Sequence, residues 1–148
     1  MNPVASRALW QTGRLYPEQV PAWAVEFLAG GTDSPALRQI AGLHRPTRAE
    51  LEPLMDRALS ELGAPALDED AAGRIAAREI ASGAIAGRMA PHAAAVSLST
   101  LWFRHELPLG VFVALVDEWE THPAFRAQIE AEIVAACGQV LEEVDADA

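Results

Sequence analysis

Four residues in the second half of the chain carry side chains that can bind a metal ion or transfer a proton. His105 and Glu106 precede an apolar segment, and Glu118 and His122 follow it. Imidazole and carboxylate groups serve as metal ligands and as general acids or bases. Glu118 and His122 would share one face of a helix that continued through both, but Pro123 disfavours helical backbone at His122. The four residues define one hypothesis, a small-molecule or metal-dependent enzyme with its site between helices.

No stronger catalytic pattern occurs in the sequence. The chain lacks HExxH, GxSxG, GxGxxG and phosphate-loop patterns, and it has no pair of cysteines for a thiolate zinc site. Its one cysteine, Cys137, excludes an internal disulfide and is expected to be a buried, inert side chain. The leading expectation is therefore a protein with no catalytic residue, no cofactor and no metal.

Charge narrows the class of partner. The 148 residues contain 11 Arg, no Lys and 21 carboxylates, which gives a net charge of −10. Residues 1–74 hold 7 Arg and 10 carboxylates (net −3), and residues 75–148 hold 4 Arg and 11 carboxylates (net −7). Because phosphate neutralisation provides most nucleic-acid affinity, we expect no nucleic-acid partner, and likewise no anionic membrane. One basic group (Arg38, His44, Arg45 and Arg48) is followed at once by acidic residues.

An aromatic pair and an acidic C-terminal region are the candidate contacts for a partner protein. Adjacent helical residues point about 100° apart, so Trp102 and Phe103 rarely reach the same core, and one of them is expected to be exposed. Trp10, Trp23 and Trp119 are expected mainly in the core. The acidic residues are Glu130, Glu132, Glu142, Glu143, Asp145 and Asp147. We predict contacts through Trp102, Phe103, Glu142 and Glu143.

Proline and glycine punctuation predicts an all-α fold, a single compact bundle of seven to eight helices. Proline recurs where helices would begin and glycine where they would end, while alternating strand patterns are nearly absent. Pro53 predicts a kink or a later start in its helix. The helix expected from Pro108 is apolar on nearly every side, which predicts a central position. The expected starts are Asn2-Pro3, Pro17 or Pro21, Ser34-Pro35, Thr47, Asp68, Pro91, Pro108 and Thr121-His122-Pro123.

A short repeat divides the chain. Gly-Arg-x-x-Pro occurs at 13–17 and again at 87–91. It predicts one helical domain, 1–148, with internal halves 1–66 and 67–148 related by a pseudo-twofold axis. The alternative is that helix–Gly–Pro–helix links simply recur in all-α proteins. Arg14 and Arg88 are interpreted as structural, because arginine after a helix can bind the terminal carbonyls.

The sequence as a whole favours a soluble, acidic, non-catalytic helical module that binds another, basic, protein. A regulatory adaptor and an immunity-type protein both fit this description. The first residues lack a signal-peptide pattern, and the longest apolar run is about half of the ~20 residues that a membrane span needs, so we expect a cytoplasmic protein. The Ala- and Arg-rich composition is typical of a GC-rich bacterial genome. Two alternatives remain: acidity that only maintains solubility, and a homodimer that completes its own core.

Overall fold

The computed structural model describes residues 2–104 and 107–146, and every regular element within these ranges is helical. Eight α-helices lie in the described residues, which confirms the predicted all-α class. The backbone contacts divide the chain into two compact units, Met1–Asp68 and Glu69–Ala148, a boundary two residues from the predicted one. That both units act as one domain stays a prediction.

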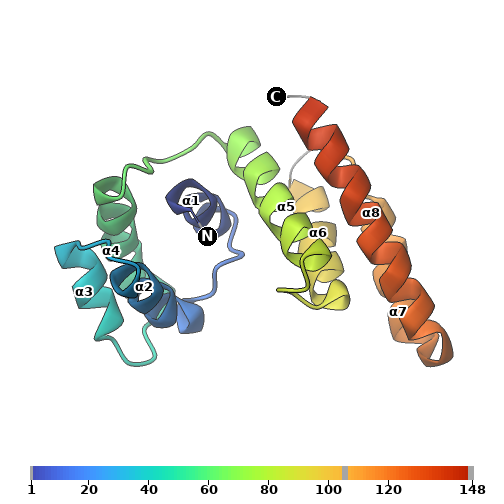
Figure 1. The fold of residues 1–148 in the computed structure, drawn as a ribbon, viewed down its shortest axis with the longest axis horizontal. Coiled ribbons are helices and arrows are strands. Elements are labelled where there is room, and N and C mark those ends of the chain that lie inside the picture. Colours follow the sequence, from blue (N-terminus) through green and yellow to red (C-terminus); the bar gives the residue numbers. More distant parts are fainter. Residues whose placement is uncertain (1, 105–106, 147–148) are drawn as a thin grey trace. The chain divides into compact units, whose positions relative to one another are not determined.

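Unit 1 contains four short helices. They are α1 (Pro3–Gln11), α2 (Val20–Ala29), α3 (Pro35–Ala41) and α4 (Arg48–Glu61), with a 3-10 turn η1 (Pro17–Gln19) before α2. Helix α3 packs between α2 and α4, and α1 packs on α4 (Figure 1). The fully buried side chains include Leu37, Ile40, Leu51, Met55 and Leu59.

Three of the four predicted helix starts in unit 1 are confirmed by side-chain caps. The second helix, expected from Pro17 or Pro21, starts as the 3-10 turn η1 at Pro17 and continues as α2 from Val20, without a side-chain cap. Asn2 Oδ1 accepts a hydrogen bond from Ala5 N at 2.7 Å, and Ser34 Oγ accepts one from Leu37 N at 3.1 Å. Thr47 caps α4 in the same way. The later start expected from Pro53 is wrong, because α4 begins at Arg48 and continues through the proline. Pro53 is the sixth of the 14 residues of α4, past the first turn, so it removes the hydrogen bond that its N–H would donate to the Ala49 carbonyl.

A buried arginine joins the elements of unit 1. The Arg7 side chain is 4% exposed. Its Nε donates to the Ala64 carbonyl at 2.9 Å, and its Nη1 lies 3.1 Å from Asp56 Oδ1. Gln11 and Leu67 exchange two further hydrogen bonds, of 2.9 and 2.8 Å. The segment after α4, from Ala64 to Leu67, is thus bound along α1.

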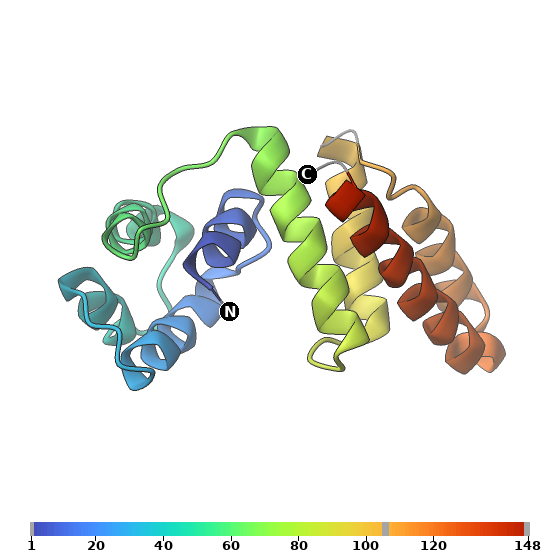
Figure 2. The same cartoon turned by 45° about the horizontal axis from the view of Figure 1, so that its top comes forward.

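Unit 2 is built from longer helices. They are α5 (Glu69–Ile85), α6 (Pro91–Arg104), α7 (Val111–Thr121) and α8 (Arg126–Ala146), with a 3-10 turn η2 (Pro123–Phe125) before α8. Helix α8 packs on α5, α6 and α7, and α6 also packs on α5 and α7. Figures 1 and 2 show the four helices side by side with roughly aligned axes.

The expected central position of the helix after Pro108 is wrong. Helix α7 begins at Val111, not at Pro108, and within it only Phe112 and Leu115 are buried. Val111 is 50% exposed and Val113 is 38% exposed. Helix α7 packs only against α6, α8 and the adjoining turn η2 among the described elements, so the faces turned away from them remain exposed. The apolar composition of this segment did not show which of its side chains would pack against another helix.

The repeated Gly-Arg-x-x-Pro segments form the same turn. Gly13 has φ +74° and Gly87 has φ +75°. In each turn, the two residues after the glycine donate to one carbonyl in the preceding helix: that of Leu9 in unit 1 and that of Gly83 in unit 2. Arg14 Nη1 also donates to the Thr12 carbonyl at 2.7 Å, the structural contact that the sequence predicted. The elements that follow differ, η1 in one unit and α6 in the other, and the duplication stays a prediction.

Candidate functional site

The described part of unit 2 has a pocket where α7 turns into α8. Its volume is about 360 Å³. Helix α7 contributes Glu118 and the residue after its end, His122, while η2 and α8 contribute the rest. We call it the α7–α8 pocket, and its lining residues are Glu118, His122, Phe125, Gln128, Ile129 and Glu132.

Local backbone geometry explains why these residues meet. His122 leaves the helical conformation, with φ −126° and ψ 71°, as the following proline predicted. The η2 turn then reverses the chain, so that Phe125 is 57% exposed at the mouth of the pocket. The helical period of α8, which places Ile129 and Ile133 in the core, would put Phe125 on the same buried face. That placement is wrong, because Phe125 belongs to the 3-10 turn and not to α8.

Two of the four residues in the enzyme hypothesis share this pocket. Glu118 and His122 both line it, and His122 Nδ1 lies 2.9 Å from Thr121 Oγ. His105 and Glu106 lie outside the described residues. Among residues 2–104 and 107–146, no three His, Cys, Asp or Glu side chains are grouped to hold a metal ion. The pocket as described offers two solvated carboxylates beside an apolar surface.

A stacked cluster next to the pocket was not predicted from the sequence. The Trp119 ring lies 3.7 Å from the His92 ring in a stacked arrangement, and the Arg126 guanidinium lies 3.8 Å from its centre. Two groups this close would overlap on one face, so they cover opposite faces. Trp119 Nε1 donates to Glu130 at 3.2 Å. His92 joins α6 to α7 through this contact, because a flat imidazole fits the indole face.

The predicted partner contacts lie at the opposite end of α7 from the pocket. Trp102 is 42% exposed near the end of α6, and its indole lies against Gly110. Glu142 and Glu143 are exposed on α8. Figures 1 and 2 place the end of α6, the start of α7 and the end of α8 at one end of unit 2. The Phe103 side chain lies outside what the structure describes.

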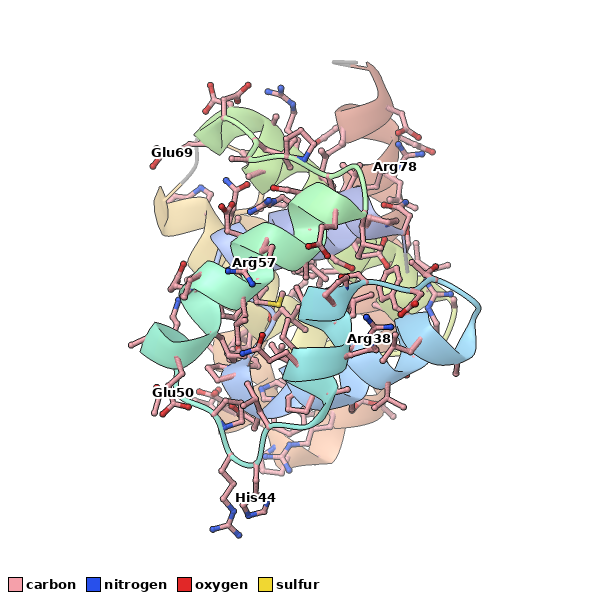
Figure 3. The ribbon with its side chains drawn as sticks, turned by 90° about the vertical axis from the view of Figure 1, so that its left-hand side faces the viewer. Arg38, His44, Glu50, Arg57, Glu69 and Arg78 are labelled. Carbon is pink, nitrogen blue, oxygen red and sulfur yellow. The ribbon has the colours of Figure 1, made fainter. Side chains whose placement is uncertain are left out.

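The basic group of unit 1 does not form a single cationic surface. Arg38 pairs with Asp33 at 3.0 Å. Arg48 pairs with Glu52 at 2.9 Å and lies 4.2 Å from the centre of the Trp10 ring. His44 projects from the loop between α3 and α4, as Figure 3 shows. Two of these side chains therefore have acidic partners.

Cys137 is an inert core residue, as expected. Its side chain is fully buried in α8. Burial raises the pKa of the Cys137 thiol to about 11, since an apolar environment disfavours the thiolate. A thiol with so high a pKa is a poor nucleophile at neutral pH.

Comparison with known proteins gives the chain no relative: no family model, no curated protein and no solved structure matches it. None of the described helices combines the length and apolar character needed to cross a membrane.

Proposed function

We propose that this chain is an acidic, non-catalytic helical protein that binds a basic partner protein through one end of unit 2. We call this surface the tryptophan end and define it by Trp102, Val111, Glu142 and Glu143. The observation that carries the proposal is the exposure of Trp102, at 42%, beside the start of α7, where Val111 is 50% exposed.

The chemistry of this surface suits protein recognition. Tryptophan is enriched among the residues that contribute most to protein–protein affinity, because it buries a large apolar area on binding. Neighbouring carboxylates attract a basic partner and orient its approach. The same negative charge opposes nucleic acids and anionic membranes.

The proposal includes a soluble, cytoplasmic role as a regulatory adaptor or an immunity-type protein. A homodimer is a weaker alternative, because two copies with a charge of −10 each repel one another. The enzyme hypothesis stays a prediction, since only Glu118 and His122 of its four residues are described, and both are solvent-exposed.

The test compares the binding of one partner to matched variants. The full chain recovers its partner from extract, and the purified pair is then studied by calorimetry. Trp102→Ala is expected to weaken binding by about tenfold or more, as for a central aromatic contact. Glu142→Gln/Glu143→Gln is expected to weaken it less.

Control variants alter similar groups in unit 1. Tyr16→Ala removes an aromatic side chain that is 47% exposed, and Glu26→Gln/Glu50→Gln removes two exposed carboxylates. Both are expected to retain wild-type affinity. Equal affinity of all variants would show that the tryptophan end is not the binding surface.

A further inference from the structure

We propose that the α7–α8 pocket receives an arginine side chain from a basic amphipathic helix of the partner protein. This inference rests on the proposed function, that the chain binds a basic protein, and adds a second contact to it. The pocket lies near the end of α7, whereas the tryptophan end lies near its start.

The pocket offers an apolar surface for the methylene stem of an arginine. Ile129, which is 4% exposed, and Phe125, which is 57% exposed, both line the pocket. Long basic side chains pack their methylene groups on such surfaces and keep the charged end in water. The aromatic face of Phe125 can also stack against a planar guanidinium.

Two carboxylates that line the pocket can bind the guanidinium of this arginine. Glu118 comes from α7 and Glu132 from α8, and both line the pocket. Neither forms an ion pair with another described residue. Opposing carboxylates suit a guanidinium, which presents several N–H donors in one plane.

Arg126, the one arginine between residues 111 and 145, makes its contacts outside the pocket. Residues 111–145 contain eight carboxylates and one arginine, Arg126, a net charge of −7. Arg126 covers the Trp119 ring, and its Nε donates to the Trp119 carbonyl at 3.0 Å. The pocket therefore keeps a negative charge that a basic partner can neutralise.

The shape of the pocket favours a protein segment over a small molecule or a second copy. Five of its six lining residues are exposed, and Ile129 alone is buried, so it cannot enclose a free ligand as small-molecule sites do. A symmetric dimer through this face would bring Glu118 and Glu132 toward their own copies, where like charges repel. A helix lying between α7 and α8 would cover the pocket and bring its own positive charge.

The test uses the full-length protein and a synthetic amidated helix. The peptide, of about 18 residues, consists of alanine and leucine with arginines at i, i+4 spacing, and a second peptide carries citrulline at those positions. Citrulline keeps the shape of arginine without its charge. Amide chemical shifts of Glu118, His122, Phe125 and Glu132 are expected to move with the arginine peptide and not with the citrulline peptide.

Matched variants separate a specific pocket from general acidity. Glu118→Gln/Glu132→Gln is expected to weaken the arginine peptide by about fivefold, the effect of two exposed ion pairs. Phe125→Ala removes the ring that stacks on the guanidinium and is expected to weaken binding of the arginine peptide as well. Glu142→Gln/Glu143→Gln removes the same charge from α8 outside the pocket and is expected to have less effect. Circular dichroism checks that each variant is folded.

The outcomes distinguish this inference from the proposed function. Equal weakening by both double variants would show diffuse attraction and overturn the pocket. Sedimentation could also show a dimer that the Glu118→Gln/Glu132→Gln variant dissociates. This result would assign the pocket to a second copy of the chain and would also overturn the proposed arginine site. If the natural partner needs Trp102 but not the pocket residues, the inference fails while the proposed function stands.

Discussion

Arg7 illustrates how a single charged residue can organise a small helical unit. Its guanidinium lies inside unit 1, where it binds the Ala64 carbonyl, the Asp56 carboxylate and the Ser60 hydroxyl. Asp56 itself is 70% exposed, so the pair has one buried and one solvated member. Loss of Arg7 should therefore lower the free energy of unfolding more than loss of Asp56, because it leaves the buried Ala64 carbonyl without a donor.

Two substitutions at this pair should have very different costs. Arg7→Met fills much of the same volume but leaves the Ala64 carbonyl unpaired, and we expect it to lower the free energy of unfolding of unit 1 by about 2–4 kcal/mol. Asp56→Asn removes one charge at an exposed site and should cost about 1 kcal/mol or less. Native-state hydrogen exchange of α1 and α4 amides measures both values. Similar values for the two variants would show that the exposed carboxylate matters as much as the buried contacts.

At the scale of the elements, helix ends depend on the glycines that close α1 and α5. The turns after α1 and α5 place Gly13 at φ +74° and Gly87 at φ +75°, a region that glycine adopts without strain. An added Cβ would meet nothing within 4 Å at either position, so any cost of substitution comes from the backbone alone. Gly138 also has no atom within 4 Å of an added Cβ, but it lies within α8, where alanine is the better helix former.

Substitution by alanine should therefore lower the free energy of unfolding at Gly13 and Gly87 and raise it at Gly138. Gly13→Ala and Gly87→Ala are each expected to destabilise their unit by about 1–2 kcal/mol. Gly138→Ala is expected to stabilise unit 2 by about 0.5–1 kcal/mol. Urea unfolding of the three variants beside the wild type measures the differences. A stabilising effect of alanine at position 87 would contradict the left-handed turn.

Helix ends were predictable from the sequence because their causes are local. Asn2, Ser34 and Thr47 cap the backbone within three residues of their own position, and the helices that they precede begin where the sequence placed them. The start expected at Pro108 is found three residues later, at Val111, where no side chain caps the helix. Exposure was harder to predict, because it depends on neighbours that are distant in the sequence. Val111 has the same apolar side chain as a core residue and yet is half exposed.

In the candidate sites too, local features were predictable from the sequence and contacts between distant residues were not. The sequence predicted that one residue of the Trp102–Phe103 pair would be exposed, and Trp102 is 42% exposed. The enzyme hypothesis grouped Glu118 with His122, and both line the α7–α8 pocket. The stacking of His92 on Trp119 was not predicted, since it joins α6 to α7 across 27 positions of sequence. The period of α8 would place Phe125 in the core, but the 3-10 turn η2 does not keep that period.

At the scale of the whole molecule, negative charge is concentrated in one half of the chain. Residues 1–68 carry 6 Arg and 8 carboxylates (net −2), and residues 69–148 carry 5 Arg and 13 carboxylates (net −8). An asymmetric field of this kind raises the rate at which an oppositely charged protein arrives in a productive orientation. In the complex that we propose, this field would contribute less to the lifetime, which would depend on the apolar contacts of Trp102.

The separate roles of charge and of apolar contact predict how salt and mutation affect the association and dissociation rate constants of partner binding. Raising NaCl from about 50 to about 500 mM should lower the association rate constant by about tenfold, because salt screens the charges of unit 2 over distances beyond a few ångströms. The dissociation rate constant should change little. Trp102→Ala should do the opposite, raising dissociation with association nearly unchanged. Surface plasmon resonance with the purified partner resolves both constants, and an association rate that is independent of salt would mean that the acidity of unit 2 has no part in recognition.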